Sequence, residues 1–291
     1  MTTRRRVRKA VFPVGGLGTR FLPATKSLPK EMLTVVDKPL IHHAVEEARS
    51  SGIEQFIFVT GRNKSPIEDH FDYSFELEQT LLEQDKQREL AALRSWMPAA
   101  GRVAYTRQQR PLGLGHAVLC ARELVGDEPF AVVLADDLVL GPKPCLGQLL
   151  AVHEKTGGNV VAVMDVPRAE TRRYGVLAVG ADDGHLAEVV GLVEKPAPEA
   201  APSTLSVIGR YVLLPEIFAH LERQAPTAGG EIQLTDAMAG MIGSAPFHGL
   251  RFEGTRFDCG TKIGFLKANV AFAMQSDELK DELGAFLRTL A

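Results

Sequence analysis

Glycines and cations gather directly after the first apolar run of the chain, and together they can bind phosphate. Gly15, Gly16 and Gly18 would let the backbone approach a ligand closely and turn its N–H groups toward an anion. Arg20 and Lys30 follow within the same proline-containing stretch. We expect this segment to hold a polyanion such as a nucleoside triphosphate, with a solvated basic loop as the alternative.

Two common phosphate-binding motifs do not fit this stretch. A P-loop needs the pattern G-x-x-x-x-G-K-[ST], and the chain contains no Gly-Lys pair. The dinucleotide fingerprint G-x-G-x-x-G would place Phe21 where a third glycine allows close packing of helix and strand. An NAD-dependent oxidoreductase is therefore disfavoured.

Carboxylates at the ends of apolar runs are the next candidates for residues with a role in function. Asp136 follows the run Pro129–Ala135, where a carboxylate has few structural uses and a turn is the competing explanation. The side chain of Asp137 would point to the opposite face of the strand, which favours Asp136. Glu194 and Lys195 also end an apolar run, where they could form an exposed ion pair or contact a substrate.

Alternating strands and helices must position these residues in the first half of the chain. Short β-branched runs predict buried strands, and apolar residues at helical spacing predict helices. The predicted strands are Val7–Val14, Ile53–Thr60, Val103–Gln108 and Pro129–Ala135, and the predicted helices are Leu40–Ser51 and Gly115–Val125. This βαβ order predicts a Rossmann-like, doubly wound α/β sheet flanked by helices. Ligands of such sheets bind beyond the carboxyl ends of the strands.

The second half predicts a mixed sheet with a smaller β-rich region. The segment Asp182-Asp183-Gly184 is typical of a hairpin turn between two strands. The predicted strands are Asn159–Val166, Tyr174–Gly180, Leu186–Val193 and Leu205–Leu213, with short strands up to Phe257, and the predicted helices are Pro215–Gln224, Gln233–Ile242 and C-terminal helices. Without a long linker or an internal repeat, we expect one composite domain over residues 1–291.

The segment Asp72–Trp96 mixes aromatic and leucine residues with many charges. This pattern predicts a long amphipathic helix or a helix pair inserted between two strands. The helical periodicity of this segment shows only that one of its faces is buried. The segment could be a solvated arm packed on its own domain or a subunit contact.

Composition excludes several classes of protein. The 291 residues carry 33 Lys and Arg against 36 Asp and Glu, so the net charge of -3 argues against nucleic-acid binding. Three cysteines are too few and too scattered for a disulfide framework or a zinc cluster. No apolar run is long enough for a membrane span, and the run Ala10–Val14 is too short for an export signal. We expect a cytoplasmic protein.

The longest patterned segment identifies a family. The run Gly16-Leu-Gly-Thr-Arg-Phe-Leu-Pro-Ala-Thr-Lys-Ser-Leu-Pro-Lys-Glu-Met-Leu33 resembles the signature of the sugar-phosphate nucleotidyltransferases, in particular the bacterial uridylyltransferases that use glucose 1-phosphate. Further matches follow in the family's order: Gly113–Val118, Asp136-Asp137, Tyr174–Val176, Val193–Pro196, Gly209–Tyr211, Glu231–Asp236 and Asp258–Gly260. They run almost to the C-terminus.

The resemblance implies a reaction and its partners. A phosphate oxygen of glucose 1-phosphate would attack the α-phosphorus of UTP, giving UDP-glucose and pyrophosphate. The nucleophile is already an anion, so catalysis consists of positioning two polyanions and neutralising their charge. The resemblance also implies Mg²⁺ as cofactor and a homo-oligomer, a dimer or tetramer. Residues 1–140 would mainly bind nucleotide, residues 141–260 the sugar phosphate, and residues 261–291 would form C-terminal helices.

The resemblance also implies a role for each matching residue. The backbone of Gly15, where the family usually has Ala, would face the nucleotide with that of Gly16 and Gly18. Arg20 would hold the departing phosphates, Lys30 the α-phosphate, and Lys195 the phosphate of the sugar. The implied base-reading residues are Gln108 and Gly113, the sugar-binding residues are Gly175 and Glu194 with Lys195, and the metal ligands are Asp136 and Asp258. Gln109, next to Gln108, is an alternative base reader.

Two further alternatives stay open within and beyond the family. A thymidylyltransferase acting on the same sugar is disfavoured by the Pro-Lys-Glu-Met and Glu-Ile-Gln-Leu-Thr-Asp segments. A non-catalytic regulator should lack one of the catalytic cations or Asp136. The chain keeps Arg20, Lys30, Asp136 and Lys195, which favours an enzyme.

Overall fold

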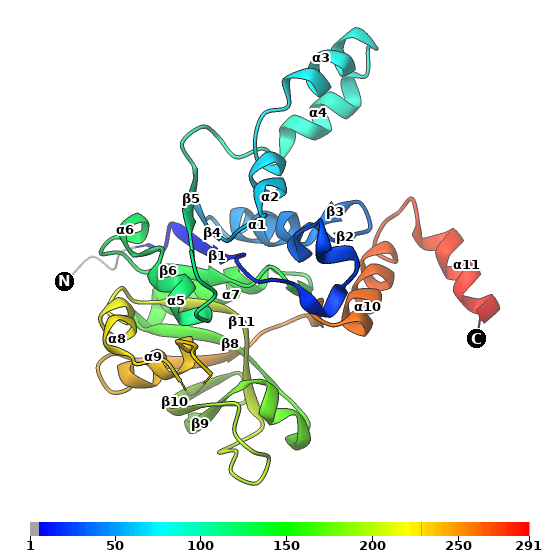
Figure 1. Cartoon of the computed structure of the whole chain (residues 1–291). Coiled ribbons are helices and arrows are strands. Elements are labelled where there is room, and N and C mark those ends of the chain that lie inside the picture. Colours follow the sequence, from blue (N-terminus) through cyan, green and yellow to red (C-terminus); the bar gives the residue numbers. More distant parts are fainter. Residues whose placement is uncertain (1–5, 228, 291) are drawn as a thin grey trace.

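A nine-stranded mixed sheet organises the computed structural model, which describes residues 6–227 and 229–290. Its strand order is β5-β4-β1-β6-β11-β8-β12-β10-β9 (Figure 1). The strands on the N-terminal side are parallel, as predicted: β1 (Lys9–Pro13), β4 (Gln55–Thr60), β5 (Val103–Arg107) and β6 (Phe130–Val133). The predicted mixed α/β class is confirmed.

Antiparallel strands extend this sheet through the second half of the chain. Strand β11 (Leu205–Leu213) is antiparallel to both neighbours, β6 and β8 (Asn159–Asp165), and β12 (Phe247–Arg251) is parallel to β8. The predicted hairpin is confirmed as β9 (Gly175–Asp182) and β10 (Leu186–Glu194). All nine residues of β11 are buried because this strand lies in the middle of the sheet.

Helices cover both faces of the sheet and bury two separate cores. On one face, α1 (Leu40–Ser50) and α7 (Cys145–Thr156) pack with Phe12 and Val133. On the other face, α5 (Leu114–Leu119), α8 (Ile217–Arg223) and α9 (Leu234–Met241) pack with Val11 and Val132. Neighbouring residues of one strand therefore enter different cores, which is the alternation that strand geometry requires.

One predicted helix is divided. The chain forms α5 and then α6 (Arg122–Val125) in place of a continuous helix over Gly115–Val125. The N–H group of Ala121 donates to the carbonyl of Val118, three residues back. This tighter bond interrupts the α-helical pattern of bonds four residues back and separates the two helices.

A helical arm stands away from the sheet (Figure 1). It follows α2 (Ser65–His70) and consists of α3 (Phe75–Glu83) and α4 (Gln87–Ser95), so the segment between β4 and β5 is a helix pair. At its base, the rings of His42 and His70 lie 4.4 and 4.7 Å from the Trp96 ring. This aromatic cluster connects the arm to α1.

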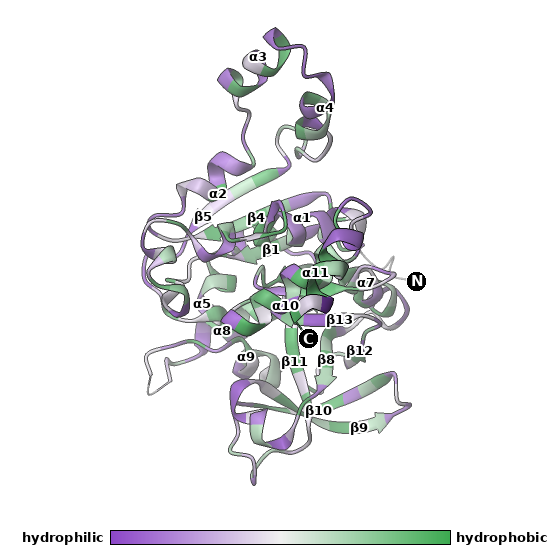
Figure 2. Cartoon of the chain, turned by 90° about the vertical axis from the view of Figure 1, so that its right-hand side faces the viewer, coloured by the Kyte–Doolittle hydropathy of each residue, from purple (hydrophilic) through white to green (hydrophobic). Residues whose placement is uncertain are grey.

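The remaining elements surround the carboxyl ends of the strands. Two small sheets pair β13 (Thr255–Asp258) with β7 (Asp137–Leu140) and β2 (Thr34–Val35) with β3 (Lys38–Pro39). The chain ends in α10 (Lys262–Ala273) and α11 (Lys280–Leu290), and α11 projects from the body (Figure 1). Figure 2 looks from the side on which these two helices lie and shows them in front of the sheet. Within residues 6–227 and 229–290, each helix is too short or too polar to cross a membrane.

Candidate active site

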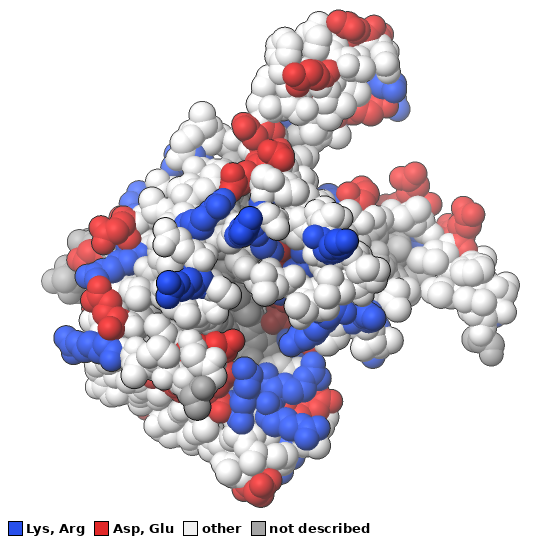
Figure 3. All heavy atoms as spheres, in the orientation of Figure 1, with Lys and Arg blue, Asp and Glu red and all other residues white. Residues whose placement is uncertain are grey.

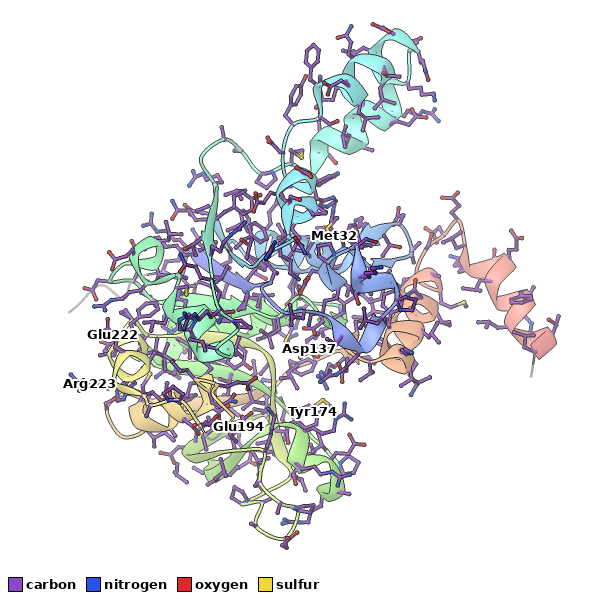
Figure 4. The ribbon with its side chains drawn as sticks, viewed as in Figure 1. Met32, Asp137, Tyr174, Glu194, Glu222 and Arg223 are labelled. Carbon is purple, nitrogen blue, oxygen red and sulfur yellow. The ribbon has the colours of Figure 1, made fainter. Side chains whose placement is uncertain are left out.

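A cavity of about 530 Å³ lies beyond the carboxyl ends of β1 and β6. It brings together seven of the residues that the sequence predicted: Arg20, Gly113, Asp136, Gly175, Glu194, Lys195 and Asp258. Figure 3 shows a hollow in this face of the molecule with Lys and Arg side chains along its rim. In Figure 4, Asp137 lies on the upper side of this region, and Tyr174 and Glu194 lie on the lower side.

The glycine loop, residues 14–18 after β1, packs directly against the side chain of Lys30, which lies further along the same connection. Prolines divide the segment that follows the glycine loop into three 3-10 helices: η1 (Thr19–Phe21), η2 (Ala24–Lys26) and η3 (Lys30–Met32). A Cβ atom on Gly18 would lie 3.0 Å from the Cβ of Lys30, and one on Gly16 would lie 3.8 Å from its Cε. Gly18 also has a φ of +66°, which favours glycine. The glycines thus leave room for the Lys30 stem.

Lys30 and Asp136 form an ion pair at the edge of the cavity, which Asp136 lines and Lys30 does not. The Lys30 Nζ lies 2.5 Å from the Asp136 Oδ2. Burial would lower the pKa of the Lys30 ammonium, but the Asp136 and Glu31 carboxylates outweigh it and raise this pKa. Burial would raise the pKa of Asp136, but Lys30 outweighs it and holds that pKa below its ordinary value. Both groups are therefore charged at neutral pH.

Arg210 fixes the strand end that carries Asp136. Its guanidinium is fully buried and donates to the Leu134 carbonyl at 2.9 Å. The same guanidinium donates to the Glu47 carboxylate of α1 at 2.6 Å. This buried pair connects a helix to β11 and to the residues just before Asp136. It gives the candidate metal ligand a rigid support.

Asp136, Asp258 and Arg20 converge around Gly260. A Cβ atom on Gly260 would lie 3.0 Å from the Asp258 Oδ1, 3.1 Å from the Asp136 Oδ2 and 3.3 Å from the Arg20 Nη1. Two carboxylate oxygens therefore face one small space, next to a guanidinium. Hard oxygen donors of this kind suit Mg²⁺, which proteins hold through one or two carboxylates and substrate phosphates. The described residues contain no group of three or more His, Cys, Asp or Glu that could hold a metal by themselves.

Asp137 lines the same cavity as Asp136, so the prediction that the two residues alternate on one strand is wrong: β6 ends at Val133, and Asp136 lies in the turn before β7. The partners of Asp137 nevertheless differ from those of Asp136. Asp137 accepts from the Arg256 Nε at 2.6 Å and from the Gly209 N–H at 3.0 Å. Arg256 in turn donates to the Tyr174 hydroxyl at 3.1 Å. Asp137 therefore connects β7 to the opposite wall of the cavity and is already neutralised by Arg256.

Gln108 lies beside both Gly113 and Gly15. Its Nε2 donates to the Gly113 carbonyl at 3.0 Å and lies 3.0 Å from the His116 Nδ1. A Cβ atom on Gly15 would lie 3.1 Å from the Gln108 Oε1. The amide N–H groups are thus occupied within the protein, and the Oε1 faces the glycine loop. Gln109, by contrast, is exposed.

The end of the β9–β10 hairpin positions the three predicted sugar-binding residues. Gly175 pairs with Glu194, and the Lys195 N–H donates to the Tyr174 carbonyl at 2.9 Å. The Lys195 Nζ lies 3.1 Å from the Glu194 Oε1. A Cβ atom on Gly175 would lie 3.0 Å from the Thr235 Oγ1 and 3.5 Å from the Glu194 Oε2. Lys195 adopts a φ of +46°, which is costly for a lysine and turns the chain at this point.

The structure adds cavity residues to which the sequence gave no role. They are Arg172, Arg173, Tyr174, Glu231, Gln233, Thr235 and Arg256. Tyr174 and the segment Glu231–Asp236 belong to motifs that the sequence already singled out. Arg173 and Arg256 had no local signal, because only the folded chain brings them to the carboxylates of Asp258 and Asp137.

Comparisons with known proteins show which family this chain belongs to. A family model described as nucleotidyl transferase matches residues 9–275. A UTP–glucose-1-phosphate uridylyltransferase of Komagataeibacter xylinus is 56% identical over 261 residues, which are 90% of this chain and 92% of the relative. A UTP-bound UGPase from Acinetobacter baumannii superposes with a TM-score of 0.91 at 42% identity, covering 98% of this chain and 100% of that one. A UDP-glucose pyrophosphorylase complexed with UDP-glucose has a TM-score of 0.84 at 41% identity, covering 93% and 100%.

Proposed function

The chain belongs to the nucleotidyl transferase family, and we propose that it transfers the uridylyl group of UTP to glucose 1-phosphate, giving UDP-glucose and pyrophosphate. The convergence of Asp136, Asp258 and Arg20 around Gly260 carries this proposal. Two carboxylates and a guanidinium in one small space suit a metal-bound triphosphate. The curated relative and the two ligand-bound structures support UTP and UDP-glucose as the ligands.

The residues of the chain position the reacting groups. The glycine loop and Arg20 hold the triphosphate, with Arg20 on the phosphates that leave as pyrophosphate. Lys195 holds the phosphate of the sugar, and Gly175 and Glu194 contact the sugar hydroxyls. A phosphate oxygen of glucose 1-phosphate attacks the α-phosphorus of UTP, and the bond from the α-phosphorus to the bridging oxygen of pyrophosphate breaks. A general base is unnecessary because the attacking phosphate is already ionised.

Magnesium is the proposed cofactor. Asp136 and Asp258 would hold it, and the bound ion would neutralise charge on the phosphates. Asp136 is paired with Lys30 in this structure, so an ion at Asp136 would leave the Lys30 ammonium available for the α-phosphate. Lys30 would then stabilise the negative charge that gathers there in the transition state.

Base recognition rests on the acceptor of Gln108. Since its N–H groups are directed to Gly113 and His116, the Oε1 is the part of this amide left for the base. Uracil presents an N3–H donor to an acceptor, whereas cytosine presents a bare N3. Gln108 would therefore accept uracil and reject cytosine.

We also propose that three consecutive segments of the chain have the separate roles that its motifs imply. Residues 1–140 supply the nucleotide loop and Asp136, residues 141–260 supply the sugar-phosphate contacts, and residues 261–291 form C-terminal helices within a single domain. A cytoplasmic location is part of this proposal and rests on the low cysteine content.

The apolar surface of the C-terminal helices supports a homo-oligomer. An apolar groove of about 540 Å³ lies between α10 and α11, and the Phe286 and Leu290 side chains of α11 are 56% and 69% exposed. A helix of 11 residues such as α11 is marginally stable in water by itself, so we expect another subunit to pack on its exposed apolar side chains. The first turn of α11 carries Asp281 and Glu282, whereas Lys280 in the same turn is already paired with Asp277. The last turn carries Arg288, so two antiparallel copies would pair opposite charges.

The oligomer is tested by light scattering after gel filtration. The double variant Phe286→Ser, Leu290→Ser should shift the protein to the monomer mass. Phe75→Ser, at a 60% exposed residue of the helical arm, is the matched control and should keep the oligomer. Dissociation by Phe75→Ser alone would move the subunit contact to the arm.

A substrate panel tests the activity itself. Pyrophosphate release is measured for UTP, dTTP and CTP, each with glucose 1-phosphate or galactose 1-phosphate, with Mg²⁺ and with EDTA. The fastest rate should be with UTP and glucose 1-phosphate, and EDTA should abolish it. A dTTP rate equal to the UTP rate would favour a thymidylyltransferase, and the absence of release from any pair would favour a non-catalytic regulator.

A further inference from the structure

Arg173 is hydrogen bonded to Asp258, the second candidate metal ligand, in this structure. It ends the 3-10 helix η4 (Arg168–Arg173), just before β9. Its Nη2 donates to the Asp258 Oδ2 at 3.0 Å, and its Nη1 donates to the Glu170 Oε2 at 3.2 Å. The guanidinium lies 5.6 Å from the centre of the Tyr174 ring. Asp258 thus has its own cation, as Asp136 has Lys30.

A guanidinium and a divalent ion compete for the same carboxylate. A metal ion at Asp258 would repel a cation that is hydrogen bonded to the other oxygen of that carboxylate. The side chain of Arg173 is 45% exposed, and Arg173 lines the cavity, so its guanidinium has space to leave Asp258.

The hairpin register places the backbone of Arg173 close to that of Lys195. Gly175 pairs with Glu194, and Tyr174 bonds to Lys195 through the backbone, so Arg173 is one residue before the position opposite Lys195. Arg173 and Lys195 therefore stand at the same end of the β9–β10 hairpin, and both line the cavity. Two cations on the lining of one cavity can bind one phosphate dianion, and a guanidinium can hold two of its oxygens at once.

We propose that Arg173 is a metal-controlled second cation for the sugar phosphate. Without metal it neutralises Asp258. When a divalent ion takes Asp258, the guanidinium turns to the phosphate that Lys195 holds. This inference rests on the proposed function for its substrate, glucose 1-phosphate, and for the metal ion at Asp258, and its metal-dependent half is tested without substrate through the Arg173–Asp258 contact.

The first test is metal binding without substrates. Mn²⁺ is titrated into the ligand-free protein and followed by electron paramagnetic resonance. Arg173→Ala should bind Mn²⁺ about two- to fivefold more tightly than the wild type. The change removes a half-exposed ion pair in which Arg173 competes with the metal ion for Asp258. Arg173→Lys should bind it with an affinity close to that of the wild type. Arg172→Ala, which removes a neighbouring cation of η4 and of the cavity lining but leaves the Arg173–Asp258 contact in place, is the matched control and should change the affinity much less.

The second test is kinetic. At saturating Mg²⁺, Arg173→Ala should raise the KM for glucose 1-phosphate by roughly tenfold, the scale of one charged hydrogen bond, with little change in the KM for UTP. Arg173→Lys should recover part of this loss. Equal or weaker Mn²⁺ binding by Arg173→Ala, or no Mn²⁺ binding by the wild type, would overturn the proposal. A rise confined to the KM for UTP would also overturn it. Tighter Mn²⁺ binding by Arg173→Ala in a protein that releases no pyrophosphate would overturn only the proposed function.

Discussion

The Lys30 ammonium and the Asp136 carboxylate are 2.5 Å apart, although 106 positions separate the two residues in the chain. One comes from the loop after β1 and the other from the turn between β6 and β7. Each holds the other in its charged form, because Asp136 raises the pKa of Lys30 and Lys30 lowers the pKa of Asp136. The site therefore keeps both groups charged before any substrate arrives, and the pair would open when Asp136 holds a metal ion and Lys30 holds the α-phosphate.

Replacing Asp136 tests the first metal ligand. Asp136→Asn should reduce turnover by several orders of magnitude, because charge neutralisation supplies most of the catalysis. The circular dichroism spectrum should not change, because the amide can still occupy the same space. Turnover close to that of the wild type at saturating Mg²⁺ would remove Asp136 from the metal site.

Replacing Lys195 tests the sugar-phosphate side. Lys195→Ala should raise the KM for glucose 1-phosphate and lower kcat, because the lost charge serves both binding and positioning. The KM for UTP should change much less. Steady-state kinetics with each substrate varied separately measure the two constants. A larger effect on UTP would place Lys195 in the nucleotide site.

Replacing Gln108 tests how the base is read. Uracil and thymine share the N3–H donor and differ by one methyl group, which is worth about 1–3 kcal/mol of discrimination. Gln108→Ala should therefore lose preference for UTP over CTP more than preference for UTP over dTTP. Competition assays with paired nucleotides measure both ratios. If Gln109→Ala has this effect and Gln108→Ala does not, the base reader is one residue later.

His42 predicts a loss of stability in mild acid. Burial lowers the pKa of His42 to about 4 from a model-compound value of 6.5, with a smaller contribution from His70. The unfolded chain therefore takes up this proton at a higher pH than the folded protein. Stability contributed by neutral His42 is present above pH 6.5 and is lost as the pH falls from 6.5 toward about 4.

Urea unfolding measures this loss. Between about pH 7.5 and pH 5 the free energy of unfolding should fall by about 2 kcal/mol more in the wild type than in His42→Phe, which keeps an aromatic ring against Trp96. An identical pH dependence in the two proteins would show that His42 becomes protonated at its ordinary pKa.

Local sequence was sufficient to predict the residues at strand ends. Asp136 and Lys195 each follow an apolar run, and the turn after a buried strand lies at the edge of the sheet where a ligand can bind. The hairpin around Asp182-Asp183-Gly184 was predicted for the same reason, because short turns have strong local preferences. Asp258 was reached only through the family resemblance, since its surroundings carry no comparable local pattern.

Contacts between distant segments could not be predicted. The pairing of Asp258 with Arg173 depends on how β13 lies against the start of β9, and no local pattern encodes that approach. The use of the Gln108 N–H groups by Gly113 and His116 depends in the same way on the packing of α5. Side-chain pairing across the cavity is set by tertiary packing, which periodicity and motifs do not describe.

The fate of the phosphate of glucose 1-phosphate tests the central claim most directly. The wild-type protein is incubated with UTP, Mg²⁺ and glucose 1-phosphate labelled with ³²P, and the products are separated by chromatography. Attack by the sugar phosphate on the α-phosphorus of UTP predicts that the label appears in UDP-glucose and that the released pyrophosphate is unlabelled. Label in pyrophosphate or in free phosphate would contradict this account of the reaction.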